Sequence, residues 1–170
     1  MKSKNNIGIV AASFSALGDL LISPFTRSLE TNIVINESVD EVWNKIIAFE
    51  NYKQWSPFIK SIEGKLEVGQ RITIFIQPEG EQGMEFTPTV INAEKDQELR
   101  WRGKLGYRGV FDGEHYFKLE KLNSNQTHVT HGETFTGVLV PIIWALIKKG
   151  TTQGFLSQNR ALKALVEVGI

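Results

Sequence analysis

The first regular pattern in this chain is an alternation of apolar and polar residues over 29–35. Such alternation predicts a strand with one buried face. Directly after it, Ser38 and Glu41 have the spacing of a capping box, in which both side chains bond to free backbone N–H groups at a helix start. We therefore expect a helix here, and we expect the segment 52–57 to break it, because the residue before a proline favours extended backbone.

A run of strands follows, because short apolar or alternating segments are separated by clusters of Gly, Asn or Asp. The expected strands cover residues 59–66, 70–77, 84–94, 97–105, 110–121 and 126–136. Sequential strands joined by short turns pair with their neighbours, so these segments predict an antiparallel meander with one face to be covered. Helical spacing returns over residues 138–168, and only this segment is long enough to cover the sheet.

Residues 1–28 differ from the rest of the chain, and we treat them as an N-terminal extension of one domain at 29–170. Two lysines precede an apolar stretch that Gly18 and Asp19 interrupt. A central Asp costs roughly 2.5–3.5 kcal/mol on membrane-insertion scales, which disfavours a full membrane span. The spacing favours an amphipathic helix that packs on the domain or lies on a membrane surface, and a signal segment is the second interpretation.

Composition and charge mainly exclude classes of partner. Hydrophobic residues make up 41% and charged residues 22%, as in ordinary globular proteins. Nineteen basic and nineteen acidic residues cancel, so no overall field would attract nucleic acid, and the lack of cysteine excludes disulfides and thiolate metal sites. We expect a cytoplasmic monomer or weak dimer whose partner is a hydrophobic small molecule. Membrane association or export through residues 1–28 is the alternative.

Six short motifs occur in an order that resembles one superfamily. They are E-V-W at 41–43, Y-K-Q-W-S-P-F at 52–58, L-E-V-G at 66–69, L-R-W-R-G at 99–103, F-D-G-E-H at 111–115 and T-H-G-E at 130–133. Together they resemble the START-like superfamily, also called SRPBCC or Bet v 1-like, and within it the bacterial polyketide cyclase/dehydrase-like branch. The resemblance extends over residues 29–168.

This resemblance implies an α+β fold of the helix-grip type. In it, a curved antiparallel sheet of about seven strands wraps around a long C-terminal helix, with two short helices after the first strand. The resemblance also implies a hydrophobic cavity for lipids, polyketides or similar molecules. A minority of members are cyclases, aromatases, hydrolases or chaperone cofactors, and a fold alone does not choose among these activities.

The last two expected strands carry the residues most suited to chemistry. Side chains alternate along a strand, which places His131 and Glu133 on one apolar face and His115 on the corresponding face of the preceding strand. If the turn at 123–125 closes a tight hairpin, His115 lies opposite or diagonal to the other two. A slip of one residue in the pairing would turn the cluster outward.

Three interpretations of this cluster stay open. Burial moves the pKa values of carboxyl and imidazole groups toward neutrality, so the cluster suits general acid–base catalysis. Two histidines and one carboxylate are also the ligand set of non-haem iron and some zinc centres. We favour the third, in which His131 and Glu133 satisfy each other and the backbone and offer a ligand head group a partner. We therefore expect neither a metal nor a cofactor.

Large side chains on the expected elements are the remaining candidates for ligand contact, although an aromatic stripe is more often core. They are Trp43, Trp55, Phe58, Phe86, Trp101, Phe117, Phe135, Trp144 and Phe155, and we expect about half of the aromatic set to touch a ligand.

Two glycines, Gly150 and Gly154, interrupt the last helix, where each costs about 1 kcal/mol relative to Ala. We expect them to leave room for a ligand or to allow a close approach to the sheet, and for Gly150 a bend in the helix is a further alternative. Segments 78–83 and 103–113 are expected at the cavity mouth. Motifs for phosphate-binding loops and for a serine nucleophile elbow are missing from the sequence, which disfavours nucleotide binding and serine hydrolysis.

The sequence thus predicts a protein that binds or carries a hydrophobic small molecule in an internal cavity. An enzyme of the cyclase, dehydratase or hydrolase type that uses His115, His131 and Glu133 is one alternative. A chaperone-associated interaction module with a filled interior is the other.

Overall fold

A computed structural model describes residues 23–169 of the chain and confirms the α+β helix-grip fold. The elements are β1 (Thr26–Ile35), α1 (Val39–Ile47), the 3₁₀ turn η2 (Phe49–Asn51), α2 (Tyr52–Trp55), β2 (Ile59–Glu63), β3 (Thr73–Ile76), β4 (Met84–Phe86), β5 (Thr89–Glu94), β6 (Glu98–Leu105), β7 (Phe111–Asn123), β8 (Gln126–Thr136) and α3 (Val140–Val168). The expected amphipathic helix or signal segment lies, up to residue 22, outside the described residues.

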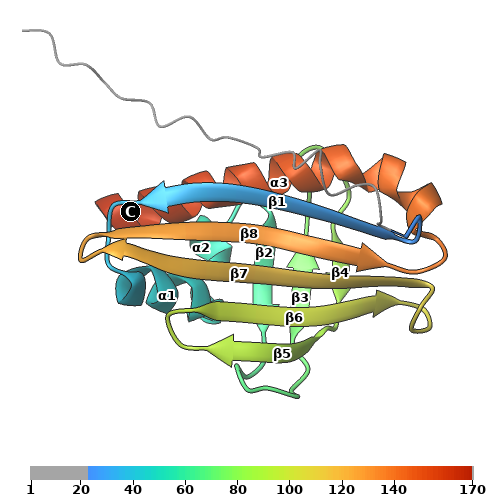
Figure 1. Cartoon of the computed structure of the whole chain (residues 1–170), viewed down its shortest axis with the longest axis horizontal. Coiled ribbons are helices and arrows are strands. Elements are labelled where there is room, and N and C mark those ends of the chain that lie inside the picture. The colour runs from blue at the N-terminus through green and yellow to red at the C-terminus, as the bar shows by residue number, and fades with distance from the viewer. Residues whose placement is uncertain (1–22, 170) are drawn as a thin grey trace, which may run out of the picture.

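The strands form two antiparallel sheets. The larger has the order β1-β8-β7-β6-β5, and the smaller has the order β2-β3-β4. In Figure 1 the larger sheet faces the viewer, the smaller sheet runs crosswise behind it, and α3 follows β1 along its whole length. Sequence neighbours pair as the meander predicts, and β1 closes the larger sheet by pairing with β8.

The expected strand over 84–94 is two strands, and this is where the two sheets separate. Pro88 lies between β4 and β5, and a proline has no backbone N–H to donate to a strand partner. The carbonyl oxygen of Pro88 instead accepts from the N–H of Ile72 at 3.0 Å. The chain therefore turns from one sheet into the other at this residue, and the combined β surface becomes concave.

Helix α1 begins where the sequence predicts, but only half of the expected capping box is present. The Ser38 hydroxyl accepts from the N–H of Glu41 at 3.3 Å, whereas the N–H of Ser38 donates to the Glu37 carboxylate at 3.2 Å. The helix also ends earlier than expected, at Ala48, so that Tyr52–Trp55 forms its own short helix before Pro57.

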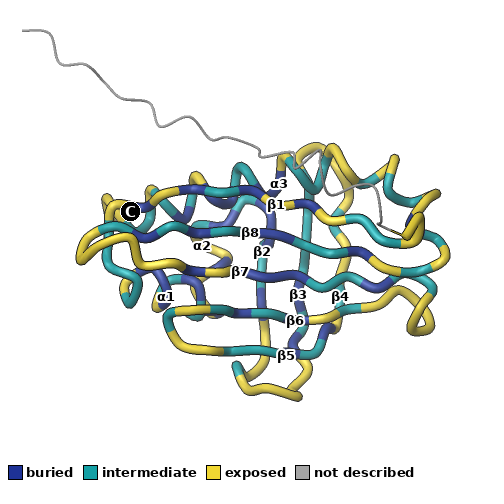
Figure 2. Tube along the Cα trace, viewed as in Figure 1, coloured by how far each residue is buried: buried dark blue, intermediate teal, exposed yellow. Residues whose placement is uncertain are grey.

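The two halves of α3 are buried to very different extents. Its C-terminal half contributes the fully buried Phe155 and Leu162, whereas Ile142 and Leu146 in the N-terminal half are 67% and 78% exposed. The central strands β7 and β8 carry buried residues at intervals, interspersed with partly buried and exposed ones (Figure 2). Helix α3 is therefore packed firmly by one half only.

Gly154 is the point of closest approach between α3 and the smaller sheet. A Cβ atom at this position would overlap the ring of Phe58, the residue just before β2. The ring of Phe58 also packs edge-on against Phe155, with ring centroids 5.7 Å apart. Of the alternatives that the sequence left open for Gly154, the structure matches close approach.

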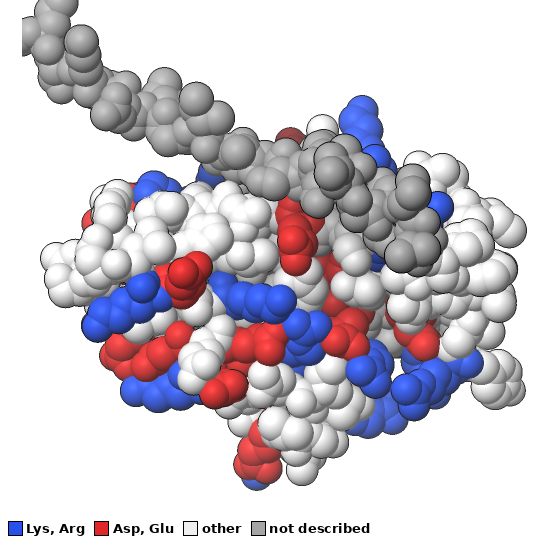
Figure 3. Space-filling model, viewed as in Figure 1, with Lys and Arg blue, Asp and Glu red and all other residues white. Residues whose placement is uncertain are grey.

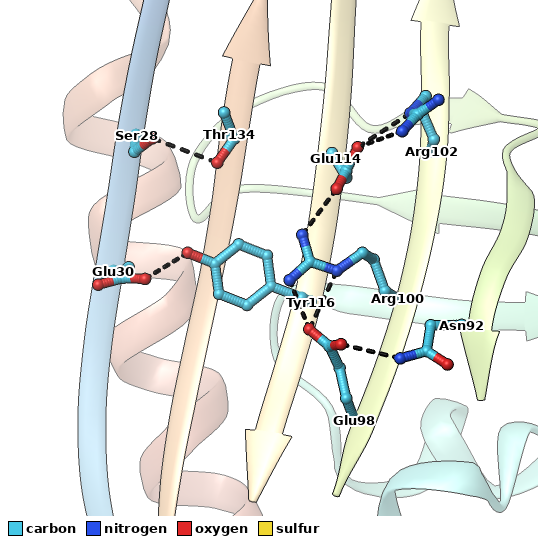
Figure 4. Close-up of polar contacts among 9 residues, drawn as sticks. All are labelled: Ser28, Glu30, Asn92, Glu98, Arg100, Arg102, Glu114, Tyr116 and Thr134. Carbon is cyan, nitrogen blue, oxygen red and sulfur yellow. Dashed lines mark hydrogen bonds and ion pairs between the residues drawn. The ribbon is translucent and has the colours of Figure 1, made fainter. Parts of the chain in front are cut away.

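The outer face of the larger sheet carries alternating charges that pair with one another (Figure 3). Glu114 on β7 accepts from Arg100 at 2.7 Å and from Arg102 at 2.7 Å, and Arg100 also pairs with Glu98. Glu98, Arg100 and Arg102 lie on β6 and Glu114 lies on the neighbouring strand β7, as Figure 4 shows. Because each charge in this group is paired with an opposite charge, the group leaves few charged atoms on the outer face without a partner.

Tyr116 packs across the middle of this face, against strands β8 and β1. Its ring lies over Gly132, where a Cβ atom would be 2.6 Å from the ring, and its hydroxyl donates to Glu30 on β1. The guanidinium group of Arg100 lies 4.5 Å from the ring centroid, a favourable cation–π distance. We therefore expect polar atoms that are free to bind a ligand on the inner face.

The contact at Gly154 predicts a difference between two otherwise identical substitutions in α3. Gly154→Ala should lower the free energy of unfolding by about 1–3 kcal/mol, because the new methyl group must displace the Phe58 ring. Gly150→Ala is the matched control: its Cβ would meet the end of the exposed Glu81 side chain at 3.0 Å and Cβ of Pro78 at an ordinary contact distance of 3.6 Å, so the helix-favouring Ala should be neutral or stabilising. Urea unfolding of both variants checks this, and equal effects would contradict it.

Candidate functional site

A pocket of about 340 Å³ lies between the inner face of the larger sheet and the N-terminal half of α3. Its walls are mainly apolar. The principal lining residues are Phe58, Ile74, Ile76, Met84, Phe86, Trp101, Gly103, Leu105, Phe111, Gly113, His115, Glu133, Phe135, Ile143, Leu146, Ile147 and Gly150. The pocket lies beside the part of α3 that precedes Gly154, the residue at which the helix packs against Phe58.

The two loops expected at a cavity mouth do contribute to this pocket. Pro78, Glu81 and Gln82 line it from one side, and Lys104 and Leu105 line it from the other. In the second segment β6 continues to Leu105 and β7 begins at residue 111, close to the expected strand bounds 97–105 and 110–121. Only residues 106–110 form the connecting loop.

The hairpin of β7 and β8 brings the predicted polar cluster together on the inner face. His115 lies directly opposite Glu133, and the next inward-facing pair is Phe117 with His131. The Nδ1 atom of His115 lies 3.7 Å from Oε2 of Glu133, and the Nε2 atoms of the two histidines are 3.1 Å apart. The register expected from the tight turn is therefore the one observed, with His115 opposite Glu133 and diagonal to His131.

A chain of hydrogen bonds behind the cluster fixes which atoms carry protons. The Thr31 hydroxyl donates to the backbone oxygen of His131 at 3.2 Å, so it accepts from the Asn159 side-chain NH₂ at 2.9 Å. The amide oxygen of Asn159 then faces Nδ1 of His131 at 2.9 Å. Because an amide oxygen only accepts, His131 carries its proton on Nδ1 and presents a lone pair on Nε2.

The same reasoning extends to His115. Its Nε2–H must donate to the Nε2 lone pair of His131, because two lone pairs cannot share a hydrogen bond. The remaining nitrogen of His115, Nδ1, is then an acceptor, and it lies on the side of Glu133 and the pocket. The His115 ring is held in place by Trp101, which stacks on it with ring centroids 4.5 Å apart and planes 7° apart.

Burial keeps all three groups uncharged near neutral pH. Desolvation lowers the pKa of His115 to about 3, and it lowers the pKa of His131 well below its ordinary value, helped by the neighbouring imidazole. Desolvation raises the pKa of Glu133 to about 8. The 3.7 Å contact between His115 and Glu133 thus joins a neutral imidazole and a protonated carboxyl group and is not an ion pair.

Glu133 reaches the pocket because its neighbour on β7 has no side chain. A Cβ atom at Gly113 would collide with Oε1 of Glu133. The Glu133 side chain keeps 18% of its surface exposed, and it accepts or donates no hydrogen bond within residues 23–169. An uncharged carboxyl group with free hydrogen-bonding capacity therefore forms part of the wall of an otherwise apolar pocket.

The other predicted contact residues divide between pocket and core. Phe58, Phe86, Trp101 and Phe135 line the pocket with His115 and Glu133. Those that are buried in the core behind it, and do not line it, are Trp43, Phe117, His131 and Phe155. Trp55 and Trp144 are partly buried against the core, and Gly154 contacts Phe58. This second group packs in or against the core, so its contact with a ligand stays a prediction, and His131 reaches the pocket wall only through its hydrogen bond with His115.

Sequence reasoning missed three residues that position the cluster, namely Thr31, Asn159 and Gly113. Two of them carried a signal. Thr31 lies between apolar residues on the inward face of its strand. Asn159 lies four residues after Phe155 on the buried stripe of α3. A polar residue on a buried stripe indicates a hydrogen-bond partner in the core. The role of Gly113 follows only from the direction of the Glu133 side chain.

The metal interpretation finds no support in this geometry. His131 engages Nδ1 with Asn159 and Nε2 with His115, so neither nitrogen is free to bind a metal. Over the whole of the described range, 23–169, no three His, Asp or Glu side chains lie close enough together to hold a metal ion.

The profile described as polyketide cyclase/dehydrase and lipid transport matches residues 26–167, which is most of the chain. The chain belongs to this family. The matched residues thus include β1, the residues that line the pocket and all of α3 except its last residue.

Solved structures similar to this polyketide cyclase/dehydrase family member share its fold at low sequence identity. A START superfamily protein from Mycobacterium smegmatis superposes with a TM-score of 0.67 at 19% identity, over 84% of this chain and 99% of that one. Norcoclaurine synthase from Thalictrum flavum, a point mutant in complex with a transition-state analogue, gives 0.65 at 15% identity, over 83% and 94%.

The di-domain ARO/CYC protein StfQ of the steffimycin biosynthetic pathway gives a TM-score of 0.67 at 9% identity. The match extends over 86% of this chain and 53% of StfQ. At these identities the likenesses show the fold alone. No functionally curated protein sequence matches this family member. Among the helices of residues 23–169, none combines the length and hydropathy needed to cross a membrane.

The raised pKa of Glu133 predicts an unusual pH dependence of stability for this family member. Between about pH 6.5 and 8 both buried histidines are neutral in the folded state, whereas in the unfolded state they are about half protonated at pH 6.5 and neutral at pH 8, which makes stability rise with pH. Glu133 acts in the opposite direction, because it is protonated in the folded state and ionised in the unfolded state, so its contribution to stability falls as pH rises. Relative to Glu133→Gln, in which the histidines titrate alike, we expect a loss of about 1.5 kcal/mol over this range.

Urea unfolding at pH 6.5 and pH 8 measures this loss. Glu133→Gln is the matched control, because Gln has the shape and hydrogen-bonding groups of the protonated acid but does not ionise. The other ionisable residues that line the pocket, Glu81 and Lys104, are exposed and should contribute little. An equal change of stability with pH in the Gln variant would contradict the assignment to Glu133.

Proposed function

We propose that this protein binds and carries a hydrophobic small molecule, such as a lipid or a polyketide, in the pocket beneath α3. The observation that carries the proposal is the pocket itself, which offers about 340 Å³ of space with mainly apolar walls. Pockets that bind small molecules typically have volumes of roughly 300–1,000 Å³, apolar walls and a few polar groups that orient the ligand.

Two further features support a binding role. The walls come from rigid strands on one side and from the loosely covered half of α3 on the other, so a ligand has both a fixed surface and a route of entry. The open pocket also argues against the interaction module, for which we expected a filled interior. Family membership is consistent with ligand binding but does not identify a ligand.

Filling the pocket with a side chain tests this proposal. Gly103 lies on the inner face of β6, and a Cβ there would meet only Pro88, at 3.6 Å. Gly103→Phe should therefore place its ring in the pocket and weaken binding of the apolar probe N-phenyl-1-naphthylamine by about tenfold or more, since one ring removes much of the free volume. Fluorescence titration measures the affinity.

Lys121→Phe serves as the control, because residue 121 is exposed on β7 away from the pocket and gains the same ring. It should bind the probe like the original protein. The proposal fails if the original protein does not bind the probe saturably, or if both variants bind it equally well.

A second candidate function is catalysis, and the specific observation in its favour is the state of Glu133. A carboxyl group that is protonated near neutral pH, beside an imidazole nitrogen with a free lone pair, has the groups needed to donate and accept a proton. A dehydratase would use Glu133 to protonate a leaving hydroxyl group. In that case Glu133 is the catalytic residue, whereas His131 is a positioning residue.

Native mass spectrometry separates the two functions. For a dehydratase, Glu133→Gln purified from the protein's own host should retain a molecule heavier by one water than the molecule retained by the original protein, because the amide cannot protonate the leaving group. For a carrier, both proteins should retain the same molecule.

A further inference from the structure

Polar groups are distributed unevenly within the pocket. Glu81, Gln82 and Lys104 are exposed and lie at its mouth. His115 and Glu133 lie on the strand wall, where His115 is only 3% exposed. A ligand that fills the pocket therefore meets apolar side chains along its length and one compact pair of polar groups on the sheet. This subsite deepens the proposed function and rests on it.

The pair offers a defined set of hydrogen-bonding atoms. The chain from Thr31 through Asn159 and His131 leaves Nδ1 of His115 as an acceptor. The Glu133 carboxyl group supplies one O–H donor and one carbonyl acceptor. The two residues are 3.7 Å apart, which is too far for a direct hydrogen bond. A single oxygen atom fits between them at about 2.8 Å from each.

A hydroxyl group satisfies this arrangement better than other head groups do. It donates to Nδ1 of His115 and accepts from the O–H of Glu133, and it replaces a water molecule that the same gap suits. A ketone or aldehyde oxygen only accepts, so it leaves Nδ1 unpaired. A carboxylate meets no cation on this wall, because the nearest basic lining residue, Lys104, is exposed at the mouth.

An ammonium group is the closest competitor, since it donates to both residues. It requires Glu133 to ionise, and the apolar wall then has to desolvate two charges. The groups that face Glu133 do not stabilise that ion pair. Its strand partner on β7, His115, is neutral, and its strand partner on β1 is Leu29. The part of α3 that lines the pocket contributes the apolar residues Ile143 and Ile147.

We propose that the ligand is an uncharged apolar alcohol or phenol whose hydroxyl group bridges Nδ1 of His115 and the carboxyl group of Glu133. The apolar remainder of the ligand then extends toward the mouth between α3 and β4. His131, Asn159 and Thr31 act as positioning residues that hold the acceptor nitrogen toward the ligand.

Four ligands with one ring system test this assignment: naphthalene, 2-naphthol, 2-naphthylmethylamine and 2-naphthoate, titrated calorimetrically at pH 7. We expect 2-naphthol to bind about tenfold more tightly than naphthalene, because two neutral hydrogen bonds replace water. The amine and the carboxylate should each bind more weakly than 2-naphthol.

Two variants of Glu133 locate the effect. Glu133→Gln keeps one donor and one acceptor, so it should retain the advantage of 2-naphthol over naphthalene. Glu133→Leu removes both and should abolish that advantage, while its affinity for naphthalene shows that the pocket is intact. Gly113→Ala should also reduce the advantage, because its methyl group displaces the Glu133 carboxyl group without changing residue 133.

The outcomes separate this inference from the proposed function. Equal affinities for 2-naphthol and naphthalene would overturn the hydroxyl assignment and leave a carrier of apolar molecules. Tightest binding of the amine, lost in Glu133→Gln, would overturn it in favour of a cationic ligand. Failure of all four to bind would contradict the proposed function itself, and the inference with it.

Discussion

The contact between Gly154 and the ring of Phe58 governs the rest of the structure. It brings the C-terminal half of α3 close enough for Phe155 and Leu162 to enter the core and for Asn159 to reach His131. The price of a glycine within a helix, about 1 kcal/mol, is modest beside the burial of these large side chains. The other half of α3 is more exposed, and the pocket lies between it and the inner face of the larger sheet.

The buried polar residues depend on that same contact. Asn159 reaches the sheet only because α3 is close, and its amide sets the proton on His131, which in turn sets the proton on His115. Each link places a donor opposite an acceptor, so the core accommodates two imidazole rings without any charge. The ring of His131 is also stacked between Phe117 and Phe155, with centroids 4.3 Å and 3.9 Å away. An apolar environment that excludes water therefore keeps the whole cluster, including Glu133, neutral.

The fold could be predicted from the sequence to a large extent, because hydrophobic periodicity and local motifs report on neighbours along the chain. The pairing of His115 with Glu133 followed from alternation and a short turn. Features that depend on distances between remote segments could not be predicted. Periodicity did not indicate that Pro88 divides the strands into two sheets, and it did not distinguish Phe135 at the pocket from Phe155 in the core. The direction of Glu133 depends on the missing side chain at Gly113, which is a three-dimensional fact.

The position of His115 and Glu133 on adjacent strands, opposite a wall made by α3 and the loops, has an evolutionary consequence. Recognition of a ligand's polar end is confined to one pair of facing ladder positions, whereas the space for its apolar part depends also on residues of α3 and the smaller sheet. Substitutions in those other elements leave the polar pair itself unchanged. Descendants of such a scaffold can thus change the size of their ligands and the chemistry of the head group in separate steps.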